Sequence, residues 1–208
     1  MSSLIIIGAG GHGNTVYEIA KRSNKYSKID FLDDCVGSDL IRNKKMKNKI
    51  IGKIDSLSSY SILSSYESAF VAIGDNKIRG SLIKKLLDLG LKIPFLKHET
   101  AVVSESASIC KGVLLAANCV VQSYSKIGVG SIINTSSTID HDSIIGENVH
   151  VCPGVNIAGE VVIGNNSFIG IGSNVIQQIN IGHDVFIPAG VLVKNDISSF
   201  SKIKRDII

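Results

Sequence analysis

Residues 126–145 read KIGVGSIINTSSTIDHDSII, and every sixth residue from Ile127 to Ile145 is isoleucine. The same phase extends in both directions, from Val103 to Val193, and all sixteen positions of this series hold isoleucine, leucine or valine. The position four residues after each of these, from Ala107 to Val191, holds alanine, cysteine, serine or valine, with Ile179 as the exception. A fixed period of six residues identifies a hexapeptide repeat, which predicts a coiled parallel β-structure.

Each hexad predicts one short strand followed by a corner. The large branched residue fills the interior, and the small residue fits a tight bend two residues before the next inward residue. Three hexads complete one triangular coil, so the repeat predicts about five coils, or a prism about 24 Å tall at ~4.8 Å per stacked strand. The composition agrees, because 44% of the residues are hydrophobic and 20 are glycine, while only 5% are aromatic.

Residues 3–98 show a different pattern, in which short apolar runs alternate with stretches of helical character. We expect a small Rossmann-like parallel α/β domain over residues 1–98, joined near residues 97–101 to a β-helix domain over residues 99–208. The expected strands are 4–7, 29–32, 69–73 and 93–96, and the expected helices are 14–23 and 76–89.

The first expected strand runs directly into the sequence GAGGHG, residues 8–13. Its glycines fit the pattern G-x-G-x-x-G between a strand and a helix, and acidic residues follow about 20 residues later, as in dinucleotide-binding domains. A complete dinucleotide fold needs two such halves, and residues 1–98 have room for one. We therefore expect a mononucleotide or nucleotide-diphosphate ligand rather than NAD. The alternative is a glycine loop that serves only the tight packing of strand and helix.

The remaining composition excludes several classes of protein. No stretch approaches about 18 uncharged apolar residues and the start MSSLIIIG has no basic leader, so we expect no membrane insertion, no signal peptide and a cytoplasmic location. The four cysteines lack the spacing of a zinc site or a disulfide framework and predict free thiols. The net charge is +4. The basic cluster at residues 42–49 (RNKKMKNK) contains no aromatic residue on which bases stack, so we interpret it as a solvated loop and expect no nucleic-acid partner.

Several motifs together resemble one known family. The stretches GAGGHG (8–13), FLDD (31–34) and AIGDNKIR (72–79), followed by repeats that contain NTSSTIDHD (134–142), are similar to the bacterial sugar acetyltransferases of the PglD/NeuD type. The resemblance implies a left-handed β-helix that forms homotrimers, with acetyl-CoA bound between neighbouring prisms. The implied acceptor is the amine of a UDP-linked 4-amino sugar or, in the NeuD branch, a sialic acid hydroxyl.

His141 is also a candidate general base on its own evidence. It stands two residues after the inward-facing Ile139, so we expect its ring to project outward between Asp140 and Asp142. A neighbouring carboxylate stabilises the imidazolium and fixes the ring, which suits a general base near neutral pH. Asn134, on the preceding face, is expected to help orient this ring.

The resemblance implies the remaining site residues. On the acetyl-CoA side, His150 contacts the cofactor, the Gly159 N–H donates to the thioester oxygen, and Ile171 and Ala189 line the channel. On the nucleotide-sugar side, the amides of a glycine loop hold the diphosphate and an acidic pair binds ribose or base; the residues are Gly10, Gly11, His12, Asp33, Asp34 and Gly74. The chain departs from the family at residues 200–208 (FSKIKRDII), where relatives carry G-x-P-A-K near the CoA adenine, so we expect Lys202, Lys204 and Arg205 to contact CoA phosphates.

Three other functions were compared with acyl transfer from the sequence: a metal enzyme, a purely structural β-helix and an NAD-dependent enzyme. A metal enzyme of the γ-carbonic-anhydrase type needs three neighbouring histidines, and here His183 lies about two coils beyond His141 and His150, so we expect no metal site. A purely structural β-helix leaves the glycine loop unexplained, and an NAD-dependent enzyme lacks the second half-fold. Within acyl transfer, the His12 loop and the acidic pair favour a UDP-linked amino sugar over sialic acid.

Overall fold

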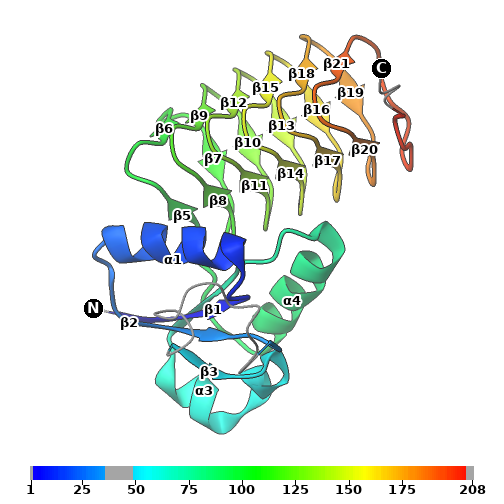
Figure 1. Cartoon of the computed structure of the whole chain (residues 1–208). Helices are drawn as coiled ribbons and strands as arrows, with labels where there is room; N and C mark the ends of the chain where they lie inside the picture. The colour runs from blue at the N-terminus through cyan, green and yellow to red at the C-terminus, as the bar shows by residue number, and fades with distance from the viewer. Residues whose placement is uncertain (1, 36–48, 205–208) are drawn as a thin grey trace. The chain divides into compact units, whose positions relative to one another are not determined.

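The computed structural model describes residues 2–35 and 49–204. The chain divides into two compact units, one ending at Leu96 and the other beginning at Lys97 (Figure 1). Residues 42–48 of the basic cluster and Arg205 lie outside the described residues. Within the described ranges, no helix has the length and apolar character needed to cross a membrane.

The first unit is a four-stranded parallel sheet with the strand order β3-β2-β1-β4. Its elements are β1 (Ser2–Ile7), α1 (Gly11–Arg22), β2 (Tyr26–Leu32), β3 (Ile50–Gly52), the 3-10 helix η1 (Ile54–Ser58), α3 (Tyr60–Ser65), β4 (Ser68–Val71) and α4 (Asn76–Asp88). Helix α1 packs against β1 and β2, and α4 packs against β4. Residues 4–7 of the inner strand β1 are fully buried, as a continuous apolar strand in a helix-covered parallel sheet should be. The α/β class expected for this region is confirmed.

The structure differs from the sequence expectation in several elements: β2 begins at Tyr26 rather than at residue 29, and β3, η1 and α3 were not expected. Helix α1 begins at Gly11 rather than at Asn14, because Gly10 takes the N-cap position with an extended backbone. The expected strand at 93–96 does not form; Lys92 makes only an isolated bridge to Ser68, and Pro94 has no N–H to donate to a ladder. Leu96 and Lys97 instead form β5, which joins a sheet of the β-helix.

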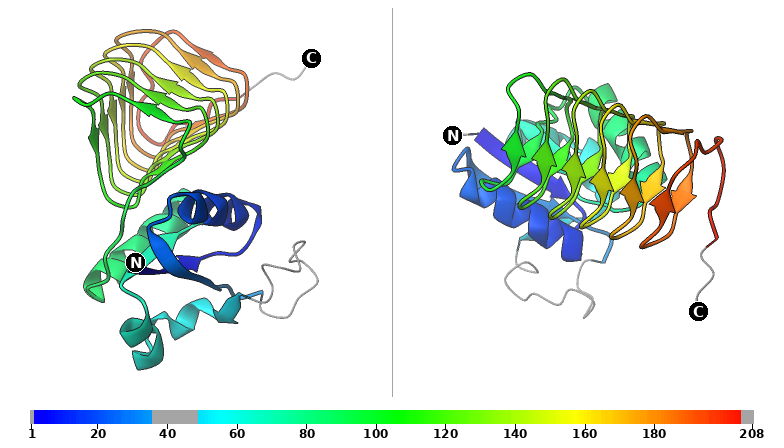
Figure 2. Two further views of the ribbon diagram at one scale, coloured as in Figure 1. Left: turned by 90° about the vertical axis from the view of Figure 1, so that its left-hand side faces the viewer. Right: turned by 90° about the horizontal axis from the view of Figure 1, so that it is seen from above.

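The second unit is a parallel β-helix whose two-residue strands stack into three sheets (Figure 2). Each sheet is named here by its first strand: the β5 sheet (β5-β8-β11-β14-β17-β20), the β6 sheet (β6-β9-β12-β15-β18-β21) and the β7 sheet (β7-β10-β13-β16-β19). The register advances by 18 residues per coil, as in the pairs Ile132↔His150 and Ile139↔Ile157.

The strands recur every six residues almost without exception. They are β5 (Leu96–Lys97), β6 (Val102–Val103), β7 (Ser108–Ile109), β8 (Leu114–Leu115), β9 (Val120–Val121), β10 (Lys126–Ile127), β11 (Ile132–Ile133), β12 (Thr138–Ile139), β13 (Ile144–Ile145), β14 (His150–Val151), β15 (Asn156–Ile157), β16 (Val162–Ile163), β17 (Phe168–Ile169), β18 (Asn174–Val175), β19 (Asn180–Ile181), β20 (Phe186–Ile187) and β21 (Leu192–Val193). The second residue of each strand from β6 onward belongs to the aliphatic series read from the sequence. From Leu115 to Val193 these residues are at most 4% exposed and form one continuous core.

The small residues at the corners fit the limited space there, and those that are serines also form hydrogen bonds with backbone groups. The buried Ser131 hydroxyl donates to the Gly146 carbonyl oxygen (2.7 Å) and accepts from the Val149 N–H (2.9 Å). The hydroxyls of Ser143, Ser167 and Ser173 make the same two contacts, each with backbone groups of the next coil. Since a buried backbone group without a partner costs about 1–3 kcal/mol, these hydroxyls stabilise the tight bends that the hexapeptide repeat requires.

Candidate active site

His141 lies at the corner where the chain passes from β12 in the β6 sheet to β13 in the β7 sheet. About half of its side chain is exposed, its Nδ1 is 2.9 Å from Asp142 Oδ2, and its backbone N–H donates to Asp140 Oδ1 at 2.8 Å. Asp142 adopts the left-handed backbone conformation, with φ of 57°, which aspartate tolerates better than most residues. The outward direction expected for His141 and its pairing with Asp142 are both present.

The charges around His141 favour its protonated form. The hydrogen bond with Asp142 raises the pKa of His141 above its ordinary value; desolvation opposes this, and the negative charges of Asp140, Asp142 and Glu160 add to the rise. Because Nδ1–H donates to Asp142, the opposite nitrogen Nε2 is the one that takes up a proton. The pair therefore has the orientation and the charge balance of a general base.

Gly159 lies against the same imidazole, one coil further along the prism. A Cβ at this position would lie 2.7 Å from both Nε2 and Cε1 of His141, so only glycine leaves the ring where it is. The carbonyl oxygen of Gly159 accepts from the Gln178 N–H (3.0 Å), while its own N–H has no hydrogen-bond partner among the residues that the structure describes. A proton-accepting nitrogen and an available backbone donor thus occupy one corner.

A second histidine–aspartate pair has similar geometry but a different environment. His183 Nδ1 lies 3.0 Å from Asp184 Oδ2, yet the Phe200 ring packs against the His183 ring in a T-shaped arrangement, with 4.6 Å between centroids. The space that glycine leaves beside His141 is filled here by an aromatic ring. Within residues 2–35 and 49–204, no three histidine, cysteine, aspartate or glutamate side chains are grouped as metal ligands.

Asn134 lies with His150 rather than with His141. Asn134 follows β11 and His150 begins β14, both in the β5 sheet, and the side-chain nitrogen of Asn134 is 3.2 Å from His150 Nε2. Its hydrogen bond therefore corrects the expectation that Asn134 orients His141 within one chain: the two residues are separated by strand β12 and by two corners of the coil. The ring of Phe168, which pairs with His150 in register, contacts the opposite side.

Ile171 and Ala189 extend this second cluster along the prism. Both stand at the corner between the β5 and β6 sheets, in consecutive coils, and the Gly190 N–H donates to the Ile171 carbonyl oxygen (2.7 Å). The Ile171 side chain is 59% exposed. Of the four residues implied for acetyl-CoA, Ile171 and Ala189 lie at the corner between the β5 and β6 sheets, and His150 lies on strand β14 of the β5 sheet. Gly159 lies at the opposite edge of the β6 sheet, beside His141.

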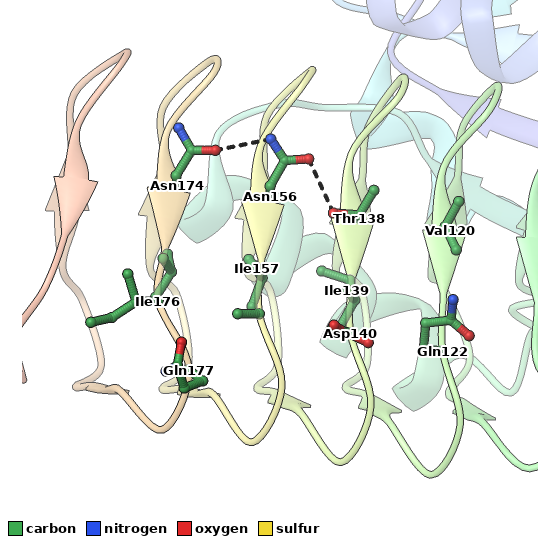
Figure 3. A pocket seen from close by; sticks show the side chains of 12 residues that line it. Val120, Gln122, Thr138, Ile139, Asp140, Asn156, Ile157, Asn174, Ile176 and Gln177 are labelled. Carbon is green, nitrogen blue, oxygen red and sulfur yellow. Dashed lines mark hydrogen bonds between the residues drawn. The ribbon is translucent and has the colours of Figure 1, made fainter.

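A shallow groove of about 580 Å³ runs across the outer face of the β6 sheet between these two edges (Figure 3). A ladder of hydrogen bonds crosses its coils: the Thr138 hydroxyl donates to Asn156 Oδ1 (3.1 Å), and Asn156 Nδ2 donates to Asn174 Oδ1 (2.9 Å). Asp140, next to His141, also lines the groove. The groove therefore covers the face of the β6 sheet and reaches the edge at which His141 stands.

In the first unit, the GAGGHG motif forms the turn from β1 into α1. Gly8 has φ of 101°, and a Cβ on Gly13 would collide with the Gly8 carbonyl oxygen, so both positions require glycine. A Cβ on Gly10 or Gly11 would meet no atom within 4 Å. The second pair therefore opens onto free space at the N-terminus of α1, where backbone N–H groups attract anions.

The two acidic residues bind backbone amides of neighbouring loops. Asp33 Oδ2 accepts from the Ala9 N–H (2.6 Å) and its Oδ1 accepts from the Cys35 N–H (2.7 Å). Asp34 Oδ1 accepts from the Ile54 N–H (3.0 Å). Asp33 thus fixes the glycine turn to the end of β2, a structural role in addition to the ribose or base contact expected from the sequence.

Arg79 is a residue of this half-site that the sequence reading passed over. It is 1% exposed, and its guanidinium donates to the carbonyl oxygens of Ile73 (3.1 Å) and Gly74 (3.0 Å) and to Asn76 Oδ1 (2.8 Å). Burial, and then the positive charge of Arg79, lower the pKa of His12 to about 4. His12 is therefore neutral at physiological pH and can offer a ligand a hydrogen bond but no charge.

A half-Rossmann unit joined to a hexapeptide β-helix, with a histidine–aspartate pair at a corner beside an available backbone N–H, defines a two-domain acyltransferase of the hexapeptide class. Residues 3–86 match the family model described as the PglD N-terminal domain. The acetyltransferase domain of PglB from Neisseria gonorrhoeae FA1090, in complex with acetyl coenzyme A, is 37% identical, with 97% of this chain and 95% of that chain covered and a TM-score of 0.89.

A second similar structure is a histidine mutant of perosamine N-acetyltransferase from Caulobacter crescentus, in complex with CoA and GDP-perosamine. It is 30% identical, with 97% of this chain and 93% of that chain covered and a TM-score of 0.88. WeeI from Acinetobacter baumannii AYE, 22% identical with a TM-score of 0.84, has the same fold. The chain belongs to the PglD/NeuD-type family of sugar acetyltransferases; it is an acetyltransferase, and its β-helix is the left-handed form of that family.

Proposed function

We propose that this chain transfers the acetyl group of acetyl-CoA to the amine of a nucleotide-linked sugar, specifically a UDP-linked 4-amino sugar. The observation that carries the proposal is the corner at which the imidazole of His141, paired with Asp142, lies against Gly159, whose N–H has no partner among the described residues. Acyl transfer to an amine needs a proton acceptor for the nucleophile and a donor for the developing oxyanion. Both groups are present there, and the similarity to structures solved with acetyl-CoA or with CoA and a nucleotide sugar supports the same chemistry.

The proposed reaction proceeds through a tetrahedral intermediate. His141 Nε2 takes a proton from the attacking amine as the bond from nitrogen to the acetyl carbon forms, while Asp142 stabilises the imidazolium. The Gly159 N–H donates to the oxyanion, and a donor of this kind is typically worth about 2.7–4 kcal/mol of the barrier. The carbon–sulfur bond then breaks, and the imidazolium returns its proton to the departing thiolate of CoA.

On the acetyl-donor side, we propose that acetyl-CoA lies along the edge formed by His150, Ile171 and Ala189. The exposed side chain of Ile171 offers apolar surface to the pantetheine arm. Lys202 and Lys204 follow in the last described residues, and both are exposed. These lysines are the candidate partners of the CoA phosphates.

On the acceptor side, we propose that the nucleotide diphosphate binds at the N-terminus of α1. Gly10 and Gly11 leave room for it, and neutral His12 contributes a hydrogen bond. Asp33, Asp34 and the Gly74 turn, which Arg79 holds in place, surround the ribose and base.

We further propose that the working unit is a homotrimer. Within one chain, His141 and the His150 edge lie on opposite sides of the β6 sheet, so one copy does not bring both to one acetyl group. A threefold ring, in which one edge of each copy meets the opposite edge of the next, joins them three times over. We place this enzyme in the cytoplasm, where acetyl-CoA and nucleotide sugars are made.

A thiol-release assay tests the proposed reaction. Purified protein with acetyl-CoA is offered a UDP-4-amino sugar, GDP-perosamine or sialic acid, with the His141→Gln variant as the matched control. We expect thiol release and an N-acetylated product with the UDP-linked amino sugar, and a loss of about 10²–10⁴-fold in kcat in the variant. Turnover of sialic acid alone would show that the acceptor is a hydroxyl group and not an amine. Equal rates for the wild-type protein and the His141→Gln variant would show that His141 is not the base.

A further inference from the structure

Strands β1 and β4 of the first unit are neighbours from which the chain leaves in opposite directions. After β1 the chain passes through α1 to β2 on one side, and after β4 it passes through α4 to Lys92, which bridges to Ser68 on the other side. In parallel α/β sheets, ligands bind in the crevice outside the carboxyl ends of such a pair of strands. The walls of this crevice are the glycine turn after β1 and the turn of residues 72–75 after β4, the β4–α4 turn.

The two walls are in direct contact. The Ala72 N–H donates to the Ile7 carbonyl oxygen (2.7 Å), and a Cβ on Gly8 would lie 2.8 Å from the Ala72 carbonyl oxygen. A phosphate group bound at the glycine turn would therefore lie next to the β4–α4 turn, whose peptide groups become its candidate partners.

Arg79 sets the direction of these peptide groups. Its side chain is 1% exposed, and it donates to the carbonyl oxygens of Ile73 (3.1 Å) and Gly74 (3.0 Å) and to Asn76 Oδ1 (2.8 Å). The C=O and N–H of a trans peptide group point in opposite directions, so the N–H of Asp75 lies on the side of the turn away from Arg79. This N–H has no hydrogen-bond partner among the residues that the structure describes.

The charge of Arg79 is felt in both walls. Burial lowers the pKa of Arg79 to about 10 and the negative charge of Asp75 opposes this, so the guanidinium is positively charged at neutral pH. After burial, the same charge is the second cause of the lowered pKa of His12 in α1. Asp33 and Asp75 bring carboxylates into the two walls, so an entering diphosphate meets negative charge, and a nearby permanent cation offsets that repulsion.

We propose that Arg79 is a positioning residue of the acceptor site, which turns the β4–α4 carbonyl oxygens inward so that the N–H of Asp75 donates to a phosphate oxygen of the nucleotide sugar. Arg79 acts through the turn and through its charge, without touching the ligand. The inference rests on the proposed function in one respect, that the acceptor carries a nucleotide diphosphate.

The donor role of the Asp75 N–H is tested by comparing Asp75→Pro with Asp75→Ala. Asp75 has φ of −65°, the value that proline requires. Both variants lose the carboxylate that caps α4 by accepting from the Ile78 N–H (2.9 Å), but only proline also loses the N–H. Alanine is therefore the matched control for every effect except that of the hydrogen bond.

Isothermal titration calorimetry measures the binding of UDP and, in parallel, of GDP, with uridine and guanosine as probes that lack phosphate. We expect the Kd of the nucleoside diphosphate to be about tenfold higher in Asp75→Pro than in Asp75→Ala, with equal nucleoside affinities. Equal diphosphate affinities in the two variants would overturn the donor role. An equal loss for the nucleoside would place the N–H at the ribose or base and overturn the phosphate contact.

The positioning role is tested with Arg79→Lys and Arg79→Met. Lysine keeps the charge but loses the fork that holds the turn, and methionine keeps neither. We expect the KM for the nucleotide sugar to rise about tenfold or more in Arg79→Met and less in Arg79→Lys, with the KM for acetyl-CoA unchanged. Lys84→Met, which removes an exposed cation from the same helix, is the control and should leave both constants unchanged.

A purely structural role predicts a different result. The unfolding temperature would fall in Arg79→Met while the KM for the nucleotide sugar stayed at the wild-type value, and that outcome would overturn the proposal. If Arg79→Met does not fold, the lysine variant and the Asp75 pair decide. If the wild-type protein binds UDP or GDP but acetylates no amino sugar, the proposed function fails while calorimetry still decides the role of Arg79. Binding of neither nucleotide by the wild-type protein would overturn the proposal.

Discussion

At the scale of single residues, the environment of each histidine separates its role more clearly than its position in the sequence. His141 and His183 each follow an inward isoleucine by two residues and each pairs with the next aspartate. The His141 ring has a glycine beside it, and the His183 ring has Phe200. The absence of a side chain at Gly159 is what leaves the His141 ring in its place.

The pH profile should report the Asp142–His141 pair. Asp142 raises the pKa of His141, and activity requires the neutral ring, so the acidic limb of kcat/KM lies at the raised pKa. Asp142→Asn removes the main cause of this rise and should move the limb to lower pH. It should also lower the plateau by about tenfold, because the imidazolium loses its partner. Asp184→Asn, the same change beside His183, is the control and should leave the profile unaltered.

Gly159→Ala should inactivate the enzyme by displacing the base. The added methyl would lie 2.7 Å from His141 Nε2, so the ring must turn away, and a misplacement of about 1 Å can cost about 10² in rate. The backbone N–H is retained, so a loss of activity reports on the ring and not on the oxyanion donor. We expect kcat to fall about 100-fold with an unchanged unfolding temperature. A kcat within twofold of wild type would show that the ring tolerates the methyl group.

At the scale of elements, the hexapeptide repeat predicts far more than the α/β region does. Because three hexads form one coil, residues that are 18 apart in the sequence are neighbours in consecutive coils. The contact of Gly159 with His141 could therefore be predicted from the sequence, since the two residues are 18 apart. The contact of Asn134 with His150 could not, because their separation of 16 residues depends on how far the asparagine side chain reaches beyond its strand. In the sequence Asn134 is nearer to His141, but strand β12 and the corners on either side of it separate the two residues.

The start of α1 and the role of Arg79 could not be read from residue patterns. The sequence expectation begins the helix at Asn14, whereas the structure begins it after Gly10 with no side-chain cap. Arginine on an amphipathic helix usually faces solvent, and only the three hydrogen bonds to the β4–α4 turn show why Arg79 is buried.

Gly11→Leu should separate the two ligands. Gly11 opens the first turn of α1, where a side chain meets no atom within 4 Å, so the substitution should leave the fold intact and obstruct the proposed diphosphate position. We expect the KM for the nucleotide sugar to rise about tenfold or more, with the KM for acetyl-CoA unchanged. Thr15→Leu, one turn further along the same helix and exposed, is the control. A parallel rise of both constants would contradict the division of ligands between the two units.

At the scale of the whole molecule, the proposed reaction centre is divided into two parts within one chain. The proposed base His141 and the proposed oxyanion donor Gly159 lie at one edge of the β6 sheet, and His150 and Asn134 lie beyond its other edge, on the side of the β5 sheet. The outer face of the β6 sheet separates the two parts, so a single copy cannot bring them together. The sequence gives no direct signal for this, since it depends on which corners of the prism each residue reaches and on the arrangement of separate chains.

Subunit complementation follows from this arrangement. His141→Ala and His150→Ala proteins should each be inactive, but in a cyclic trimer that contains both variants, one of the three sites combines the intact His141 of one copy with the intact His150 of another. If the chains mix at random in equal amounts, about three quarters of the trimers are mixed, so co-expression should restore about a quarter of the wild-type sites. The activity of co-expressed protein is compared with that of the two variants purified separately and combined without exchange, and sedimentation reports the oligomeric state. A co-expressed sample no more active than the combined one would show that each chain carries its own complete site, and the proposal of a site shared between copies would have to be withdrawn.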